Sequence, residues 1–188
     1  MKQAARAMLL LVSLSACGTS PEPSYYSLAT IPGTASPTIS PTIKIHRPTL
    51  ATYLDRPEFI EQKNDFQITI DDINYWAEPI DRMFERIMAD DLRQRLPASH
   101  VLTDNEALSE NPRFIVNLTI DHFNQTGNGM VLFEGELMVQ DNNAAGRVEH
   151  IPLHVTADSD SSPQSIALNL SKLVAQTADR LVVAVTHQ

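Results

Sequence analysis

The sequence has few of the residues that cross-link a chain, carry positive charge or span a membrane. Its 188 residues include one cysteine, 6 glycines, and 14 lysines and arginines against 23 acidic residues. A single cysteine excludes an intramolecular disulfide. The net charge of -9 gives no positive field of the kind that binds nucleic acid, so we expect no nucleic-acid partner. No apolar run reaches the roughly 20 residues of a membrane-spanning helix, which excludes a multi-span membrane protein.

Motifs of the common enzyme classes are also missing. The sequence has no Gly-x-Ser-x-Gly nucleophile motif, no Gly-x-x-x-x-Gly-Lys phosphate loop and no Gly-x-Gly-x-x-Gly dinucleotide motif. His150 and His154 lie four apart in a predicted strand, about 13 Å from each other, too far to share a metal ion. Residues 158–162 begin like a calcium loop but lack its later glycine and glutamate. Glu134 and Glu136 fit an exposed strand face. We therefore predict no catalytic residue, no metal and no cofactor.

The N-terminus has the organisation of a bacterial secretion signal. Two basic residues precede a short apolar run at residues 7–12, and small residues follow it. Leu14-Ser15-Ala16-Cys17 resembles the lipobox, in which the cysteine is acylated and becomes the first residue of the mature protein. We predict a signal peptide at residues 1–16 and lipidation at Cys17. The alternative is an ordinary signal peptide with an unmodified cysteine.

Cleavage of the signal peptide would change the net charge of the protein, and lipidation would determine its location in the cell. Removal of residues 1–16 takes away Lys2 and Arg6, so the net charge changes from -9 to -11. Such an acidic protein is not drawn electrostatically to anionic lipid headgroups, but three acyl chains suffice for stable anchoring. Gly18 follows the cysteine, whereas Asp there favours inner-membrane retention in enterobacterial lipoproteins. The lipobox resemblance therefore implies the outer membrane, with the protein facing the periplasm.

Residues 17–41 have the composition of a spacer. Proline, serine and threonine are abundant, and Glu22 is the only charged residue. Such a segment buries too little apolar surface to offset its loss of conformational entropy, so we expect a disordered, extended tether. Tyr25-Tyr26-Ser27-Leu28 departs from this composition. It either packs on the protein's own domain or docks on a partner or a neighbouring subunit.

The hydrophobic pattern beyond the tether predicts one α+β domain, residues 42–188. Alternating apolar residues indicate strands with one covered face, and apolar residues at helical spacing indicate two helices, each with a proline at its start. The expected strands lie at 42–46, 59–60, 66–70, 100–103, 114–121, 131–139 and 151–155, and the expected helices at 80–96 and 163–185. We expect an antiparallel sheet with both helices packed on one face.

The end of the second helix is apolar on every side. Residues 181–185 therefore need cover on every side. Two sources of cover remain open, the core of the domain or the surface of another subunit. Together with Tyr25 and Tyr26, this helix end leaves a homo-oligomer as an expectation.

Four short motifs occur in a fixed order between residues 14 and 96. They are the lipobox, Tyr25-Tyr26-x-Leu28, Tyr53-Leu54-Asp55-Arg56-Pro57 with Phe59-Ile60, and Tyr75-Trp76-Ala77-Glu78-Pro79-Ile80 with Asp91-Leu92. In this order they resemble the ABC-type transport auxiliary lipoproteins, most closely those of the PqiC type. The resemblance implies a non-enzymatic lipoprotein at the inner leaflet of the outer membrane. It implies as partner an MCE-domain protein, which spans the periplasm and carries lipid, together with a permease.

The motif residues also have physical roles of their own. Pro57 beside Arg56 predicts a rigid turn with one fixed cation, which either pairs with a carboxylate or carbonyls or binds a ligand. Trp76, just before Pro79, is expected to pack over the first turn of the helix rather than to contact lipid. The candidate partner-binding residues are Tyr25, Tyr26, Leu28, Tyr53, Leu54, Arg56, Pro57, Trp76 and Pro79, beside Cys17 as the lipidation site.

Two other classes of function remain as alternatives. An envelope hydrolase would need polar residues that converge in a deep pocket. A direct lipid carrier would need an apolar cavity between the helices and the sheet, but the apolar residues of the pattern suffice only to fill that space themselves.

Overall fold

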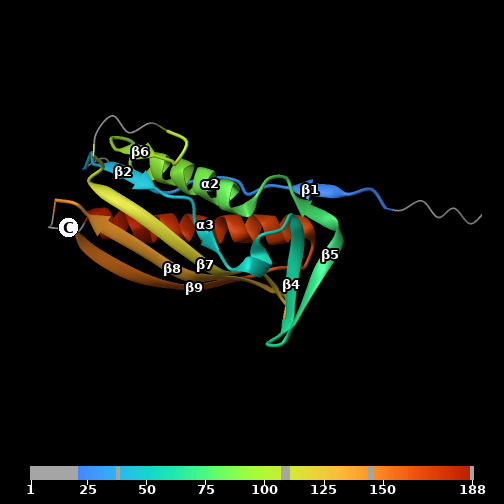
Figure 1. Ribbon diagram of the computed structural model, residues 1–188. Coiled ribbons are helices and arrows are strands. Elements are labelled where there is room, and N and C mark those ends of the chain that lie inside the picture. Colours follow the sequence, from blue (N-terminus) through green and yellow to red (C-terminus); the bar gives the residue numbers. More distant parts are fainter. Residues whose placement is uncertain (1–20, 37–38, 107–110, 144–145, 187–188) are drawn as a thin grey trace, which may run out of the picture.

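The computed structural model describes residues 21–36, 39–106, 111–143 and 146–186; the predicted signal peptide and Cys17 lie outside them. Two helices and one sheet confirm the α+β class. The elements are β1 (Ser24–Tyr26), β2 (Thr42–Ile45), β3 (Thr49–Leu50), the 3-10 helix η2 (Thr52–Leu54), β4 (Glu58–Asn64), β5 (Gln67–Trp76), α2 (Ile80–Arg95), β6 (His100–Leu102), β7 (Phe114–Thr126), β8 (Met130–Asp141), β9 (Arg147–Asp158) and α3 (Pro163–Thr186) (Figure 1).

Three long strands form the centre of the sheet. β7, β8 and β9 are consecutive and antiparallel, as their alternating apolar residues predict. A tight turn at residues 127–129 joins the first two, and Gly129 there has a φ of 77°, which favours glycine. Gly135 of β8 permits close approach of β7, because a Cβ atom at this position would lie 2.0 Å from the Thr119 carbonyl oxygen. β9 pairs only with β8 among the described strands, which agrees with Pro152 as an edge residue.

The rest of the sheet corrects the expectation of an antiparallel arrangement. β2, β3 and β4 follow one another along the other edge of β7, and all three run parallel to it. β2 also pairs in parallel with β6, and β1 with β5. Alternation reports which face of a strand is covered but not its direction. The chain returns from β5 to β7 through α2, and a crossover of this kind permits parallel pairing.

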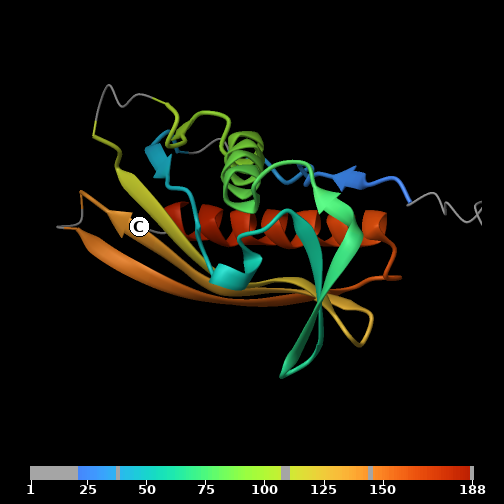
Figure 2. The same ribbon diagram turned by 45° about the vertical axis from the view of Figure 1, so that its right-hand side comes forward.

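Both helices lie on the same face of the central strands, as predicted. α3 lies between α2 and the layer of β7, β8 and β9 (Figure 2). Ser162 caps α3, because its Oγ atom accepts a hydrogen bond from the Ser165 amide at 3.2 Å. Phe84 of α2 makes edge-to-face contacts with Phe123 and Phe133, at 5.8 and 5.4 Å between ring centroids. The two helices and the sheet therefore share one core.

The apolar end of α3 is covered by the domain itself. Leu181, Ala184 and Val185 are buried in the core, and Val182 packs against it. Val183 alone among residues 181–185 points outward and is 56% exposed. Of the two sources of cover that the sequence left open, the structure therefore favours the core.

The N-terminal segment differs most from the sequence-based expectation. Residues 21–36, which we name the N-terminal strap, lie along the domain, although a disordered tether was expected there. Of the two alternatives for residues 25–28, the structure favours packing on the protein's own domain. β1 pairs with β5, and Leu28 is 3% exposed within the core. The backbone amides of the strap find acceptors: Ala29 donates to Ser171 Oγ at 3.1 Å and Ser36 to the Arg95 carbonyl at 2.6 Å. Burial of Leu28 and these hydrogen bonds offset the entropy cost of ordering the segment.

A buried acidic residue of α2 holds the middle of the strap. Asp91 accepts a hydrogen bond from the Ile31 amide at 3.0 Å and lies 3.7 Å from the guanidinium of Arg95. Arg95 is itself buried, donates to the Ile31 carbonyl oxygen at 3.3 Å and pairs with Asp179 at 2.5 Å. Burial outweighs the hydrogen bond from Ile31 and the charge of Arg95, and it raises the pKa of Asp91 to about 6.

Asp91→Asn is expected to change how stability depends on pH. The folded protein holds the Asp91 proton more tightly than the unfolded chain, so protonation stabilises the fold. The free energy of unfolding of the wild type, relative to Asp91→Asn, should therefore fall by ~1–3 kcal/mol as pH rises from about 4 to about 6. Urea unfolding at several pH values measures this difference.

Asp104→Asn serves as the control. Burial favours a higher pKa for Asp104, but hydrogen bonds from the Arg47 amide and His46, with the charges of His46 and Lys44, lower it. Folding lowers the pKa of Asp104 instead of raising it, so the wild type should not lose stability relative to Asp104→Asn as pH rises through this range. A difference for Asp91→Asn that likewise does not fall would contradict the account of Asp91.

Candidate functional site

Two of the sequence motifs line one cleft at the start of α2. The cleft has a volume of about 340 Å³. Its lining comes from the turn between η2 and β4, from the end of β5 and from the first residues of α2. The lining residues are Asp55, Arg56, Pro57, Trp76, Ala77, Glu78, Pro79 and Ile80. Four of the candidate residues, Arg56, Pro57, Trp76 and Pro79, are thus brought together.

Backbone hydrogen bonds explain why these segments meet. The Trp76 amide donates to the Pro57 carbonyl at 2.6 Å, and the Ala77 amide donates to the Tyr26 carbonyl at 2.8 Å. Tyr26 is also the register partner of Trp76 in the parallel pair of β1 and β5. The Tyr-Tyr, Arg-Pro and Trp-Ala-Glu-Pro motifs therefore form one unit, although they are separated in the sequence.

An aromatic cluster supports the floor of the cleft. The ring of Phe59 lies 4.3 Å from that of Trp76 and 5.2 Å from that of Tyr26, and Trp76 lies 6.3 Å from Phe123. Such tilted contacts add to the stabilisation that comes from burial alone. Trp76 is only 5% exposed. It is therefore held rigidly as the wall of a preformed hollow.

The polar groups of the cleft suit recognition of a peptide. The Nε atom of Arg56 is buried and has no hydrogen-bond partner among the described residues. Asp55 and Glu78 line the same hollow, and Glu78 forms an ion pair with Arg86. In such a hollow the indole can contact an apolar side chain of a peptide, and the guanidinium can donate to a neighbouring hydrogen-bond acceptor.

The remaining candidate residues do not line this cleft. Leu54 and Leu28 are buried in the core, and Tyr25 is 66% exposed and contacts the ring of Tyr75 at 5.7 Å. Tyr53 joins η2 to β7, because its hydroxyl donates to the Asp121 carbonyl oxygen at 2.8 Å. Burial, with the nearby charges of Asp121 and Glu134, raises the pKa of Tyr53 to about 12. None of these four side chains lines the cleft. Tyr53 and Leu54 instead hold η2, which precedes the turn at Asp55, Arg56 and Pro57.

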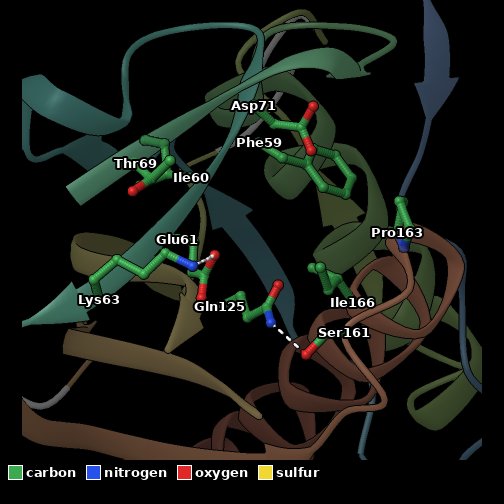
Figure 3. A pocket seen from close by; sticks show the side chains of 10 residues that line it. All are labelled: Phe59, Ile60, Glu61, Lys63, Thr69, Asp71, Gln125, Ser161, Pro163 and Ile166. Atoms are coloured by element: carbon green, nitrogen blue, oxygen red, sulfur yellow. Dashed lines mark hydrogen bonds and ion pairs between the residues drawn. The ribbon is translucent and has the colours of Figure 1, made fainter. Parts of the chain in front are cut away.

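A second cleft, which sequence reasoning missed, lies between the β4–β5 hairpin and the start of α3 (Figure 3). It has a volume of about 410 Å³ and mixes the apolar Phe59, Ile60 and Ile166 with polar groups. Lys63 pairs with Glu61, and Gln125 Nε2 donates to Ser161 Oγ at 2.6 Å (Figure 3). No sequence signal places α3 opposite this hairpin, because periodicity does not report tertiary pairing.

The polar residues of the second cleft are bound to protein partners. Burial favours a higher pKa for Asp71, but hydrogen bonds from Asn74 and Ile73 lower it, so this carboxyl is ionised at neutral pH. The neighbour of Ser161 is the amide of Gln125, which cannot act as a general base. The second cleft therefore offers no activated nucleophile at Ser161.

The described residues contain neither a cluster of metal ligands nor a membrane-spanning helix. Within the described parts of the chain, no group of three His, Cys, Asp or Glu residues could hold a metal ion. His150 and His154 instead pair across strands with Glu136 and Glu134, at 3.1 and 3.4 Å. No helix in the described ranges has the length and hydropathy that crossing a membrane requires.

Comparison with known proteins defines the family. The family described as "ABC-type transport auxiliary lipoprotein component" matches residues 26–182, so the chain belongs to this family. Membership makes the protein an auxiliary component of a transport system and a membrane-anchored lipoprotein of the cell envelope. The matched region includes two of the four sequence motifs whole and a third without Tyr25, which confirms the resemblance inferred from them. No curated protein sequence matches the chain.

Two solved structures share the fold. An uncharacterised protein is 20% identical, with a TM-score of 0.75 over 88% of this chain and 99% of its own. A protein from Xanthomonas campestris is 15% identical, with a TM-score of 0.69 over 85% of this chain and 92% of its own. These likenesses establish the fold.

Substitution of Phe59 should be visible in the fluorescence of the single tryptophan, Trp76. Phe59→Leu removes the ring that lies 4.3 Å from the indole. We expect a red-shifted emission, stronger quenching by acrylamide and a loss of ~1–2 kcal/mol in the free energy of unfolding. Phe66→Leu is the matched control, because Phe66 is 98% exposed, and it should leave all three unchanged. Equal spectra for both variants would show that Phe59 does not shield the indole.

Proposed function

We propose that the protein is a non-enzymatic outer-membrane lipoprotein of an MCE/ABC-type lipid transport system. In this role Cys17 carries the lipid anchor, and the domain docks the periplasm-spanning MCE protein at the inner leaflet of the outer membrane. The family supports the transport role and the lipoprotein character. The lipobox and the glycine at position 18 support Cys17 as the anchor and the outer membrane as its place.

The observation that carries the docking role is the cleft at the start of α2, lined by residues 55–57 and 76–80, which we name the motif cleft. It is preformed, because Trp76 is fixed by aromatic contacts and by the bond from its amide to Pro57. It places the guanidinium of Arg56, whose buried Nε atom has no hydrogen-bond partner among the described residues, beside an apolar wall. Rigid aromatic residues and arginine are the residue types that dominate the energetics of protein interfaces. We therefore assign the cleft to a segment of the MCE partner that presents an apolar side chain and an acceptor group.

A homo-oligomer remains part of this proposal. Val183, at the end of α3, is an apolar side chain that the domain itself leaves 56% exposed. It does not belong to the motif cleft, so self-association through it would leave the cleft free for the partner.

Affinity purification from membranes tests the proposed docking. Full-length protein with Cys17 intact should recover an MCE-domain protein, identified by mass spectrometry. Arg56→Ala should reduce this recovery about tenfold, as truncation of an interface arginine does. Arg147→Ala is the matched control, because Arg147 is exposed on β9 and distant from the cleft residues in the fold.

The anchor is tested in the same cells. Cys17→Ser should move the protein from the membrane fraction to the soluble fraction, since no acyl chain can then be attached. If the wild type is membrane-bound and acylated at Cys17 but recovers no MCE protein, the docking role is wrong. If Arg147→Ala and Arg56→Ala lose recovery equally, the cleft is not the docking site.

A further inference from the structure

An exposed row of apolar side chains follows the β4–β5 hairpin. We name it the hairpin apolar stripe, and it consists of Phe66, Ile68 and Ile70. Phe66, in the turn at the tip, is 98% exposed, and the two isoleucines are 39–43% exposed. Ile68 and Ile70 share one face of β5, because they are two residues apart in a strand. Neighbouring exposed apolar side chains of this kind mark interaction surfaces rather than chance exposure.

The stripe lies on a projecting part of the fold. β4 and β5 extend away from the body of the domain, and β5 runs from the hairpin tip to β1 along its outer edge (Figure 1). β1 pairs only with residues 74–76 of β5, so no strand of the described chain covers the outer edge of residues 67–73. The described chain therefore leaves both the apolar side chains of the stripe and the outer strand edge of residues 67–73 uncovered.

Two tyrosines lie at the other end of β5, beside β1. Tyr25 of β1 and Tyr75 of β5 are register partners, and their rings lie 5.7 Å apart. Tyrosine is enriched where membrane meets water, because its ring is apolar and its hydroxyl is polar. The tyrosine pair and the stripe thus lie on the same strand, β5, which runs from the hairpin tip to β1 (Figure 1).

The lipid anchor lies close to this surface along the chain. The first strand of the strap pairs with β5 from Ser24 onward, so only residues 18–23 separate this strand from Cys17. Even a fully extended chain allows no more than about 25 Å between the Cα atoms of Cys17 and Ser24. A tether of the length that composition suggests would leave the domain free to turn. The strap instead holds the end that bears β1 and β5 near the bilayer.

We infer that the hairpin apolar stripe and the tyrosine pair rest in the headgroup region of the membrane that holds the anchor. The ligand class is a phospholipid surface, and the contact works by shallow apolar insertion. The acidic net charge makes electrostatic attraction to anionic lipid an inadequate cause. Insertion of apolar and aromatic side chains beside a lipid anchor needs no such attraction. The contact would orient the motif cleft relative to the membrane plane.

This inference rests on the proposed acylation of Cys17 but not on the proposed MCE partner. It excludes two other occupants of the stripe, a second copy of this chain and a strand of a partner protein. The short connection to the anchor favours lipid, because the bilayer is the one surface that is always within reach.

Site-specific fluorescence tests the inference on the full-length lipoprotein. Acylation consumes the single cysteine, so a cysteine introduced elsewhere is the only thiol that a fluorophore can label. Phe66→Cys and Ile68→Cys probe the stripe. Val148→Cys and Val183→Cys are matched controls, because both residues are exposed valines, 44% and 56%. They lie at the start of β9 and the end of α3, far from the hairpin (Figure 1).

Each variant is labelled with an environment-sensitive fluorophore and reconstituted into phosphatidylethanolamine–phosphatidylglycerol vesicles, with and without lipids that carry a shallow spin-label quencher. We expect labels at positions 66 and 68 to shift to the blue and to lose about half of their emission to the quencher, since interfacial insertion reaches roughly 5–10 Å into the bilayer. Labels at positions 148 and 183 should not be quenched, and a blue shift at position 183 without quenching would report self-association through α3. Mass spectrometry of the same samples reports acylation of Cys17.

The outcomes separate the occupants. A blue shift without quenching at positions 66 and 68 shows cover by protein and overturns the inference. Equal quenching at stripe and control positions overturns it as well, because the stripe would then not be the oriented face. An unacylated Cys17 overturns the anchor and this inference together, whereas acylated protein with no quenching overturns only the inference. Quenching at the stripe in protein that recovers no MCE partner supports the inference and refutes only the docking role.

Discussion

The seating of the N-terminal strap on the domain is the interaction on which the rest of the structure depends. Leu28 enters the core, its amide lies 3.2 Å from Met83 Sδ, and Asp91 accepts from the Ile31 amide. These contacts place Tyr26 next to Trp76, where its carbonyl oxygen accepts from the Ala77 amide. Without the strap, β5 would lose β1 as its partner on one edge of residues 74–76, and the aromatic cluster beneath the motif cleft would lose Tyr26.

The same contacts connect the anchor to the function. A domain on a long tether could meet its partner in any orientation, and the membrane would only raise its local concentration. With the strap seated, the chain is already paired with the domain at Ser24, and the bilayer becomes a fixed neighbour. The proposed docking cleft, the lipid anchor and the hairpin apolar stripe then belong to one arrangement, in which the membrane orients the cleft toward the periplasm.

Local patterns were sufficient to predict much of the fold. The helical spacing of apolar residues predicted α2 and α3 almost to the residue, and Ser162 and Pro163 marked the start of α3 correctly. Alternation predicted β7, β8 and β9, with their antiparallel order. The motif residues Arg56, Pro57, Trp76 and Pro79 were chosen by resemblance, and the structure brings them to one cleft.

The features that sequence reasoning missed depend on contacts between distant residues. The strap was taken for a tether because its own composition is polar and rich in proline. Its acceptors, Asp91 and Ser171, lie 60 and 142 residues away along the chain, where no local pattern reports them. The parallel pairing of β2, β3 and β4 with β7 is likewise a property of chain path. The second cleft exists only because the hairpin and α3 meet in space.

Hydrogen exchange of the strap amides in the lipidated protein tests the central claim most directly. The amides of Leu28, Ala29, Ile31 and Ser36 each donate to an acceptor in the domain. The account predicts that they exchange with protection comparable to that of the amides in the middle of α2, since strap and core would open together. Exchange of these amides at the rate of a free peptide, with α2 still protected, would contradict it.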